Sequence, residues 1–328
     1  MSKVAQDHGA INLSQGFPDF DCPARLRELV AHFLNNGKNQ YPPMAGIPEL
    51  REQIALKVAG LYGYPADPDQ EVTVTSGATE ALFDAVQASV GPGDEVIVFD
   101  PAYDSYGPAI ELAGGIAVHI PLMLPDYRID WDRVKASVSG RTRLIIVNSP
   151  HNPCGAIATQ DDLAQLAAVT RDRGILVLSD EVYEHMVYDG RQHHSVLSHP
   201  ELRTRSFAVF SFGKTYHATG WKIAYCVAAP ELTAEFRKVH QFVTFTTSSF
   251  VQYGLAQFMK ECPEHALELP EFYQAKRDYF CHLLADSRFR FSPSAGTYFQ
   301  LADYSAISDL PDREFVSWLT REKGVAAI

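Results

Sequence analysis

Residues 143–180 read R-L-I-I-V-N-S-P-H-N-P-C-G-A-I-A-T-Q-D-D-L-A-Q-L-A-A-V-T-R-D-R-G-I-L-V-L-S-D. Arg143–Asn148 and Ile175–Asp180 are short, almost continuously apolar runs of strand length. Such runs are typical of strands that are buried on both faces of a parallel sheet. Between them, Gln160–Arg173 places its apolar residues on one helical stripe. The stretch therefore predicts a strand–helix–strand unit, the building block of doubly wound α/β folds.

The same alternation extends outward in both directions. It predicts a mostly parallel seven-stranded sheet sandwiched by helices, within a large domain of residues 37–230. We expect a smaller α+β domain built from residues 1–36 and 231–328, with strands near Phe289–Phe291 and Thr297–Leu301. The last apolar residues, Val325–Ile328, look like the start of a strand, so we expect the smaller domain to be C-terminally incomplete. The other five strands predicted for the sheet are Glu71–Thr75, Glu95–Phe99, Ile116–Pro121, Phe207–Phe212 and Ile223–Ala228.

Composition narrows the possible partners. The chain carries 28 Lys and Arg against 40 Asp and Glu, a net charge of −12, which disfavours binding to nucleic-acid phosphates. No apolar run reaches the ~18 residues of a membrane span, and the N-terminus lacks the pattern of a signal peptide. The five cysteines are scattered without a CxxC pair, which favours a reducing compartment such as the cytoplasm. We expect a protein that acts on small molecules.

Lys214 is the first candidate for chemistry. It directly follows an apolar strand, at the edge of the sheet where α/β proteins place their ligands. Most lysines are solvated, so its position alone favours an ordinary surface residue. A phosphate-binding P-loop is excluded because the motif needs glycine at position 208, where Ala208 stands. A Schiff-base lysine is the third alternative, and it needs a carbonyl cofactor site around it.

Other strand ends carry matching side chains. Asp180 closes an apolar strand, where a buried carboxylate needs a partner, although it could instead cap the next helix. Asn152 follows the predicted strand Arg143–Asn148, in a loop whose backbone is restricted by prolines. The turn 76–79 is built of small residues at a helix N-terminus, a natural seat for a phosphate. Tyr103 adds an aromatic ring that could equally be core. Together these strand ends are hard to explain by packing alone.

Other constellations match no known site. His185, His193 and His194 have no standard metal-ligand spacing and fall in a polar loop, so we expect no metal. Cys154 has no basic residue fixed beside it in sequence and is interpreted as an unreactive neighbour of Asn152. A hydrolase elbow GxSxG is absent. A GxGxxG loop after a strand is also absent, which disfavours a nicotinamide enzyme.

Five motifs in order then support a resemblance that covers essentially the whole chain. The sequence resembles the fold-type I, pyridoxal-phosphate-dependent aminotransferases of class I/II, and within them the methionine and kynurenine/glutamine aminotransferases. The joint match is specific, because the motifs occur in the family's order and spacing. They are L-S-Q-G-F-P-D-F (13–20), N-Q-Y-P-P-M-A-G (39–46), N-S-P-H-N-P-C-G (148–155), S-D-E-V-Y-E-H (179–185) and S-F-G-K-T-Y-H-A-T-G-W-K (211–222).

The resemblance implies a role for each matching residue. Lys214 carries the aldehyde of pyridoxal 5'-phosphate and then moves a proton, Asp180 pairs with the pyridine nitrogen, and Tyr183 hydrogen-bonds the phenolic oxygen together with Asn152. Tyr103 stacks on the ring. Gly16 and Asn152 lie on the substrate side. The residues implied for the phosphate are Gly77, Ala78, Thr79, Ser211, Lys222 and, from the neighbouring subunit of a homodimer with composite sites, Tyr41.

The resemblance implies transfer of an amino group from methionine, an aromatic or a glutamine-like amino acid to a 2-oxo acid by a ping-pong mechanism. Cysteine-conjugate β-elimination on the same site is the alternative within the family. The family's arginine for the substrate carboxylate lies beyond residue 328, so a non-catalytic cofactor-binding module is the alternative outside it. The sequence does not distinguish the preferred amino acid, although Phe17, Tyr41 and Tyr103 favour an apolar or aromatic side chain.

Overall fold

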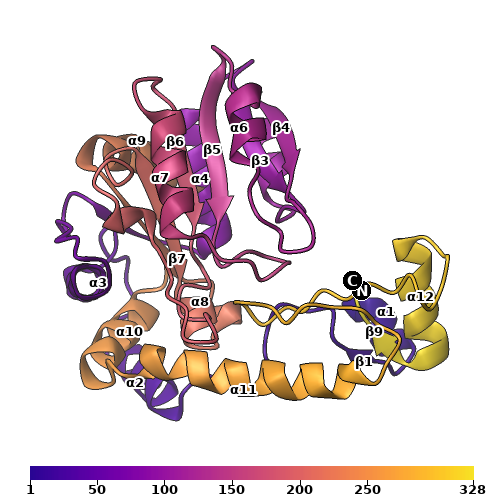
Figure 1. The fold of residues 1–328 in the computed structure, drawn as a ribbon. Coiled ribbons are helices and arrows are strands. Elements are labelled where there is room, and N and C mark those ends of the chain that lie inside the picture. The colour runs from indigo at the N-terminus through magenta and orange to yellow at the C-terminus, as the bar shows by residue number, and fades with distance from the viewer.

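A seven-stranded sheet forms the centre of the protein, which a computed structural model describes over residues 1–328 (Figure 1). The strand order is β2-β8-β7-β6-β5-β3-β4; β8 is antiparallel to both neighbours and every other pair is parallel. The predicted largely parallel sheet is confirmed, and each of the seven strands predicted for it lies within one residue of the observed bounds. The strands are β2 (Val72–Thr75), β3 (Glu95–Asp100), β4 (Ile116–Pro121), β5 (Thr142–Asn148), β6 (Leu176–Asp180), β7 (Ser206–Ser211) and β8 (Ala224–Ala228).

Helices cover both faces of this sheet, which explains why its central strands are mostly apolar. In β3, for example, Val96 and Val98 pack into one core cluster while Ile97 and Phe99 pack into the other. Successive side chains of a strand point to opposite faces, so a doubly covered strand has no polar side. One face is covered by α4 (Ala78–Ser89), α5 (Tyr106–Leu112) and α9 (Pro230–Val243), and the other by α3 (Pro48–Tyr62), α6 (Trp131–Ser137), α7 (Gln160–Thr170) and α10 (Ser249–Glu261).

The two chain ends meet in a second, two-stranded sheet. Strand β1 (Ile11–Asn12) pairs in parallel with β9 (Val325–Ala326), so that Ile11 faces Val325. The 21-residue helix α11 (His265–Ala285) runs between this sheet and the main body (Figure 1). The division into domains 37–230 and 1–36 with 231–328 stays a prediction. The remaining helices are α1 (Ser2–Asp7), α2 (Ala24–Asn35), α8 (Phe212–Thr215), α12 (Asp312–Lys323) and the 3-10 turns η1 (Val196–Ser198) and η2 (Thr219–Trp221).

Two predicted strands of the smaller domain are wrong. Neither Phe289–Phe291 nor Thr297–Leu301 forms a strand, and the region contributes only the isolated bridges Arg290↔Asp303 and Val187↔Gly296. For Thr297–Leu301 the physical reason lies at Thr297, which has φ +62°. An extended strand needs a negative φ, so this residue interrupts the run despite its β-branched side chain.

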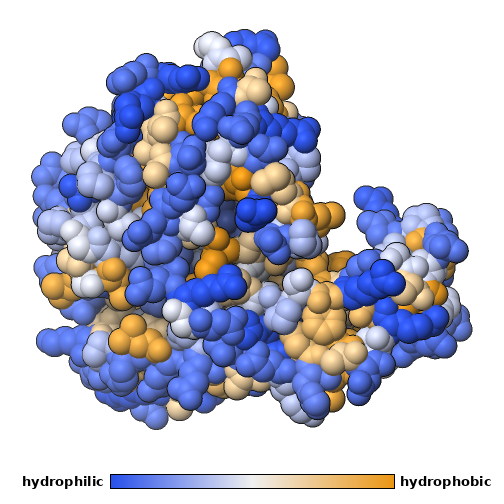
Figure 2. Space-filling view, in the orientation of Figure 1, coloured by the Kyte–Doolittle hydropathy of each residue, from blue (hydrophilic) through white to orange (hydrophobic).

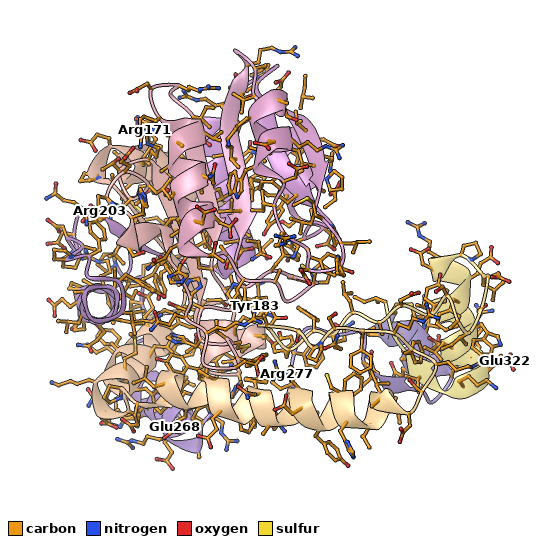
Figure 3. The ribbon with its side chains drawn as sticks, viewed as in Figure 1. Arg171, Tyr183, Arg203, Glu268, Arg277 and Glu322 are labelled. Atoms are coloured by element: carbon orange, nitrogen blue, oxygen red, sulfur yellow. The ribbon has the colours of Figure 1, made fainter.

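The surface in Figure 2 is mostly hydrophilic, with apolar residues gathered between the main body and the part built from the chain ends. In Figure 3, Tyr183 lies in this same region, between the sheet and α11. The carboxyl ends of β5, β6 and β7 carry the predicted site residues toward it.

Candidate active site

The amine of Lys214 is the centre of the site. Lys214 lies in α8, the single turn that follows β7, and its Nζ is 2.8 Å from the carbonyl oxygen of Gly16 and 2.8 Å from the hydroxyl of Tyr298. The same nitrogen lies 5.5 Å from the ring centres of Tyr183 and Tyr298. The structure therefore brings together three predicted residues, Lys214, Gly16 and Tyr183, and adds Tyr298.

Burial changes the acid–base behaviour of this amine. It lowers the pKa of Lys214 from 10.5 to about 8; Asp180 opposes the shift and Lys222 adds to it. Desolvation disfavours the ammonium form, whereas a nearby carboxylate favours it. A lysine with a pKa of about 8 is neutral in about one tenth of molecules at pH 7, far more than an ordinary lysine, so it can act as a nucleophile and as a proton acceptor.

Asp180 ends β6 and is buried beneath the site. Its Oδ2 accepts a hydrogen bond from the hydroxyl of Tyr106 at 2.7 Å, and its Oδ1 lies 3.4 Å from the backbone nitrogen of Val182. Burial raises the pKa of Asp180 to about 6, and these two hydrogen bonds oppose the rise. The carboxyl group is therefore mostly ionised at pH 7, although its pKa lies only about one unit below this pH. It needs a cationic partner to be stable in that position.

A seat for an anion lies at the N-terminus of α4. Gly77 directly precedes the helix and has φ +82°. No side chain caps the first turn, so the backbone N–H groups of that turn have no partner within the helix and can bind an anion. A Cβ placed on Gly77 would lie 3.2 Å from Nζ of Lys222, so the missing side chain admits the ammonium. Ala78 and Thr79 form the first turn. The hydroxyl of Thr79 is 3.4 Å from that of Tyr103.

The remaining predicted residues surround this arrangement less directly. Ser211 ends β7 and is the N-cap residue of α8. Asn152 is anchored through its backbone nitrogen, 2.7 Å from Oδ1 of Asn148, whose Nδ2 donates to the carbonyl oxygen of Asp180 at 2.8 Å. The loop of Asn152 is therefore tied to the end of β6, while its side chain makes no hydrogen bond within the protein.

Tyr41 is the one predicted residue that the fold of a single chain does not bring to the others. Its side chain is 84% exposed, and its aromatic contact is an edge-to-face arrangement with Phe245 at 5.6 Å. Phe242, three residues before Phe245 in the sequence, is 89% exposed. Two large aromatic side chains in open solvent are unusual for a surface that stays uncovered.

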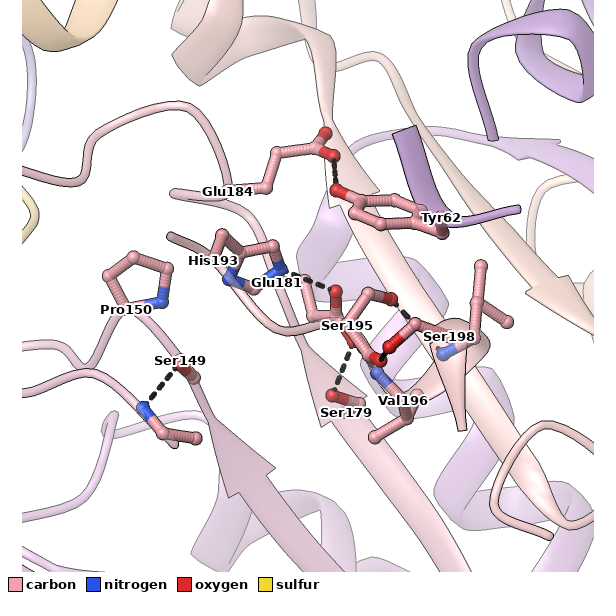
Figure 4. Close-up of polar contacts among 12 residues, drawn as sticks. Tyr62, Ser149, Pro150, Ser179, Glu181, Glu184, His193, Ser195, Val196 and Ser198 are labelled. Carbon is pink, nitrogen blue, oxygen red and sulfur yellow. Dashed lines mark hydrogen bonds and ion pairs between the residues drawn. The ribbon is translucent and has the colours of Figure 1, made fainter. Parts of the chain in front are cut away.

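Behind the site, the segment that carries Asp180 and Tyr183 is held by two glutamates (Figure 4). Glu181 accepts from the hydroxyl of Ser179 at 2.8 Å and faces Nε2 of His193 at 2.7 Å. Glu184, also buried, pairs with Lys57 of α3 and accepts from the hydroxyl of Tyr62. Buried carboxylates with several partners fix the backbone that carries them.

Two sequence interpretations of this region are corrected. The loop containing His193 is not simply polar and exposed, because the imidazole is buried against Glu181. Cys154 does have a basic neighbour: Nδ1 of His151 lies 3.0 Å from its Sγ. Burial lowers the pKa of His151 to about 4 and raises that of Cys154 to about 11, so the two remain neutral and the thiol is unreactive.

Sequence reasoning missed Tyr106, Tyr298, Glu181 and Glu184. Tyr106 had a weak signal, since it comes three residues after Tyr103 at the start of a helix. Glu181 and Glu184 stand within the motif S-D-E-V-Y-E-H, directly after an apolar strand, a position that indicates burial. Tyr298 had no local signal, because it lies 84 residues from Lys214 in the sequence and only the tertiary fold brings the two together.

Comparison with known proteins agrees with this geometry. Aminotransferase class I and II is the family that matches, over residues 8–328, and the chain belongs to it. The chain is 54% identical over 328 residues to the methionine aminotransferase of Escherichia coli (strain K12). The alignment covers 100% of this chain and 85% of that protein. A crystal structure from Escherichia coli, described as identifying a methionine aminotransferase function, has a TM-score of 0.98 at 54% identity, with coverage of 100% and 86%.

More distant relatives have the same architecture. The structure of N-succinyldiaminopimelate aminotransferase from Mycobacterium tuberculosis has a TM-score of 0.97 at 36% identity and covers 100% of this chain and 86% of that one. Kynurenine–oxoglutarate transaminase 3 of Rattus norvegicus is 34% identical over 355 residues, covering 100% of this chain and 78% of that protein. The expected fold and the expected enzyme class, an aminotransferase, are both confirmed.

Proposed function

We propose that this aminotransferase binds pyridoxal 5'-phosphate through Lys214 and transfers the amino group of methionine to a 2-oxo acid. The observation that carries the proposal is the buried Lys214 amine, whose pKa is lowered to about 8, close to the carboxylate of Asp180 and the ring of Tyr183. Methionine is proposed from the activity of the Escherichia coli relative at 54% identity. Aromatic and glutamine-like amino acids are the other donors to be compared.

The residues present fit this cofactor at each of its functional groups. Its aldehyde needs a neutral amine, its protonated pyridine nitrogen needs a buried carboxylate, and its phosphate needs N–H donors and cations. Lys214, Asp180 and the uncapped start of α4 beside Lys222 supply these groups. Asp180 in particular is a buried carboxylate without a basic side chain bonded to it, which a cationic ring nitrogen would balance. When bound, pyridoxal phosphate supplies an electron sink for the carbanion of the amino acid.

The protein's own residues then perform the positioning and the proton transfer. The free amine of Lys214 would accept the proton from the α-carbon of the substrate and, as an ammonium, would act as the proton donor later in the same half-reaction. The carboxylate of Asp180 would hold the pyridine nitrogen in its protonated form. Tyr183 and Asn152 would bind the phenolic oxygen, and Tyr103 would pack on the ring. The phosphate would be bound by Gly77, Ala78, Thr79, Ser211 and Lys222, while Gly16 would line the substrate side.

We further propose a homodimer in which Tyr41 reaches the phosphate of the neighbouring subunit. The support is the exposure of its side chain, together with that of Phe242, because large aromatic side chains in open solvent often mark a surface that a partner covers. Sedimentation of the purified protein measures the assembly directly. Tyr41→Phe should weaken cofactor binding without changing the sedimentation coefficient; a monomeric protein with full activity would exclude the composite site.

No helix has the length and apolarity needed to cross a membrane. All five cysteines are free, and three of them are buried. Free buried thiols are compatible with a reducing environment, which supports our proposal of a cytoplasmic location. Fractionation of cells that express the protein, with an exported protein as the reference, tests it.

The function is tested by absorbance and by a donor screen. The purified protein with pyridoxal phosphate should show the absorption of a lysine-bound cofactor, and methionine should shift it to that of the aminated cofactor. Lys214→Ala should abolish the covalent adduct. A fixed 2-oxo acid with a series of amino acids ranks the donors. An absorption band that no amino acid changes would contradict the proposal, and pyruvate with ammonia released from a cysteine conjugate would indicate β-elimination instead.

A further inference from the structure

Tyr298, which contacts Lys214, lies on a chain segment whose backbone is fixed by hydrogen bonds and close packing. This segment, 294–299, crosses between two loops of the main body, and we call it the strap. Its backbone pairs with the loop that follows Tyr183: the nitrogen of Tyr188 is 3.0 Å from the carbonyl oxygen of Ala295, and the nitrogen of Thr297 is 3.0 Å from that of Met186. The strap is therefore fixed to the same loop that carries a predicted cofactor residue.

Two glycines make this crossing possible. A Cβ on Gly155 would lie 2.7 Å from the carbonyl oxygen of Gly296, and a Cβ on Gly296 would lie 2.7 Å from the carbonyl oxygen of Met186. Neither clash could be relieved by a side-chain rotation, because the atoms belong to the backbone. The strap is packed against the loop 150–155 on one side and against the loop 183–189 on the other.

The residue before Tyr298 is strained. Thr297 has φ +62°, a conformation that β-branched residues avoid, and its side chain is buried. The hydroxyl of Tyr188 donates to its carbonyl oxygen. Strained residues persist where the surrounding contacts over-determine them, and they cluster at functional sites. Here the strained residue directly precedes the tyrosine that contacts Lys214.

The hydrogen bonds at Lys214 form a closed triangle. The hydroxyl of Tyr298 donates to the carbonyl oxygen of Gly16, and Nζ of Lys214 donates to both oxygens, each at 2.8 Å. Burial raises the pKa of Tyr298, so the phenol keeps the proton that it gives to Gly16. A neutral lysine amine has two N–H groups and one lone pair. With both N–H groups bound, the direction of the lone pair is fixed.

We propose that Tyr298 is a positioning residue that, with the carbonyl of Gly16, holds the freed amine of Lys214 so that its lone pair points in one direction for proton transfer. The inference rests on the proposed function, in which the Lys214 amine takes up the α-proton of the substrate as an ammonium. The charged and titratable groups around this amine are Asp180, Lys222, Tyr183 and Tyr298 itself. Tyr298 is the one among them that bonds the amine directly.

Tyr298→Phe tests this with a matched control. The substitution keeps the ring, which contacts that of Tyr183 edge to face at 5.3 Å, and removes only the hydroxyl. Tyr273→Phe is the control, because its ring is 5.9 Å from that of Tyr298 while its hydroxyl is buried without a hydrogen-bond partner. Thermal unfolding of the cofactor-free proteins shows that both variants are folded before they are compared.

The first readout needs no activity. The full-length protein freed of cofactor is labelled with acetic anhydride at a series of pH values, and the modified fraction of Lys214 is read by mass spectrometry of its peptide. Labelling of the wild type should be half-maximal near pH 8. Loss of an acceptor for the ammonium should lower this midpoint by up to about one pH unit in Tyr298→Phe, and Tyr273→Phe should leave it unchanged.

The second readout is the proton transfer of the loaded enzyme. In Tyr298→Phe we expect kcat to fall by about 10- to 100-fold with little change in KM, and the isotope effect of α-deuterated methionine to increase. Tyr298→Gln, which keeps an acceptor oxygen, should recover part of the loss. Tyr298→Leu, which has no acceptor, is the test variant should Tyr298→Phe not fold.

The inference is overturned if Tyr298→Phe matches Tyr273→Phe in both the labelling midpoint and kcat. A fall in kcat with no change in either the midpoint or the isotope effect would mean a purely structural role and would overturn it as well. The proposed function fails by a different result: Lys214→Ala that still forms a covalent adduct with the cofactor.

Discussion

Nδ1 of His240 lies 2.7 Å from Oε1 of Glu80, two buried side chains that are 160 residues apart in the sequence. The pair links α9 to the first turn of α4, since the other oxygen of Glu80 accepts from the backbone nitrogen of Ser76. Nε2 of His240 is 3.0 Å from the carbonyl oxygen of Met44. Both ring nitrogens therefore face acceptors, an arrangement that favours the charged imidazolium and stabilises the turn at the proposed phosphate seat.

This pair predicts a loss of stability at alkaline pH. Burial alone lowers the pKa of His240, but the neighbouring carboxylates of Asp84, at 3.6 Å, and Glu80, at 2.7 Å, outweigh it and raise the pKa to about 9. The folded state thus holds the proton more tightly than the unfolded chain. Its stabilisation is complete below pH 6.5 and is lost as the pH rises to about 9, at most about 3 kcal/mol.

Urea unfolding of the wild type and of His240→Gln between pH 6 and 9.5 measures this loss. The wild type should approach the variant as the pH rises. Burial raises the pKa of Asp84 to about 6, at the lower edge of this range, so the two proteins are compared above about pH 7, where Asp84 is ionised. If the free energy of unfolding depended on pH in the same way in both proteins, His240 would not be the group that titrates.

His151 predicts the opposite behaviour at acidic pH. Burial lowers its pKa from 6.5 to about 4, so the unfolded chain takes up a proton that the folded state refuses. Stability should fall as the pH drops from 6.5 towards 4, by up to about 3 kcal/mol from this residue. His151→Gln removes the titrating group, and its urea midpoint should depend less steeply on pH over this range than that of the wild type. An equally steep decline would remove His151 as a cause.

Gly77→Ala should weaken cofactor binding. The new Cβ would lie 3.1 Å from Cε and 3.2 Å from Nζ of Lys222 and would occupy the proposed phosphate seat. Gly93→Ala is the control: its φ of +85° is close to the +82° of Gly77, but nothing lies within 4 Å. Both variants should lose about 1 kcal/mol of stability through backbone strain. Only Gly77→Ala should raise the dissociation constant for pyridoxal phosphate, by about 10-fold or more, measured by fluorescence titration.

Lys57→Met should destabilise the fold strongly. Burial raises the pKa of Glu184, yet the Lys57 ammonium and the Tyr62 hydroxyl lower it overall, so removing Lys57 leaves a buried carboxylate without its counter-charge. Breaking such a buried pair costs about 3 kcal/mol or more. Lys238→Met, which breaks an exposed pair with Glu235, should cost less than about 1 kcal/mol. Equal unfolding temperatures for the two variants would show that the Glu184 network is not needed for stability.

Tyr106→Phe should shift the pH dependence of the reaction. Its hydroxyl bonds Oδ2 of Asp180 at 2.7 Å and opposes the rise that burial causes in the pKa of this carboxyl. Without it the pKa should rise from about 6 towards neutral, and less Asp180 is ionised at neutral pH. The acidic limb of kcat/KM should move up by up to about one pH unit. Tyr273→Phe should leave that limb in place, and an unmoved limb in Tyr106→Phe would exclude the coupling.

The fold was largely predictable because its signals are local. A strand covered on both faces is mostly apolar, so the seven strands stand out in the sequence. The ends of β6 and β7 bring Asp180 and Lys214 to one edge of the sheet. The smaller domain was less predictable. Its segment around Thr297 has the composition of a strand, but a positive φ held by tertiary contacts overrides that local preference.

The amino-acid sequence by itself therefore determined the class of fold, the family and the set of strand-end residues, because these depend on periodicity and on short motifs. Only the tertiary structure decided which distant side chains complete the site. Tyr298 reaches Lys214, Glu80 reaches His240 and Lys57 reaches Glu184 across 84, 160 and 127 residues of chain. Contacts of this kind leave no periodic trace in the sequence, since they depend on how buried polar groups find partners when separate elements pack together.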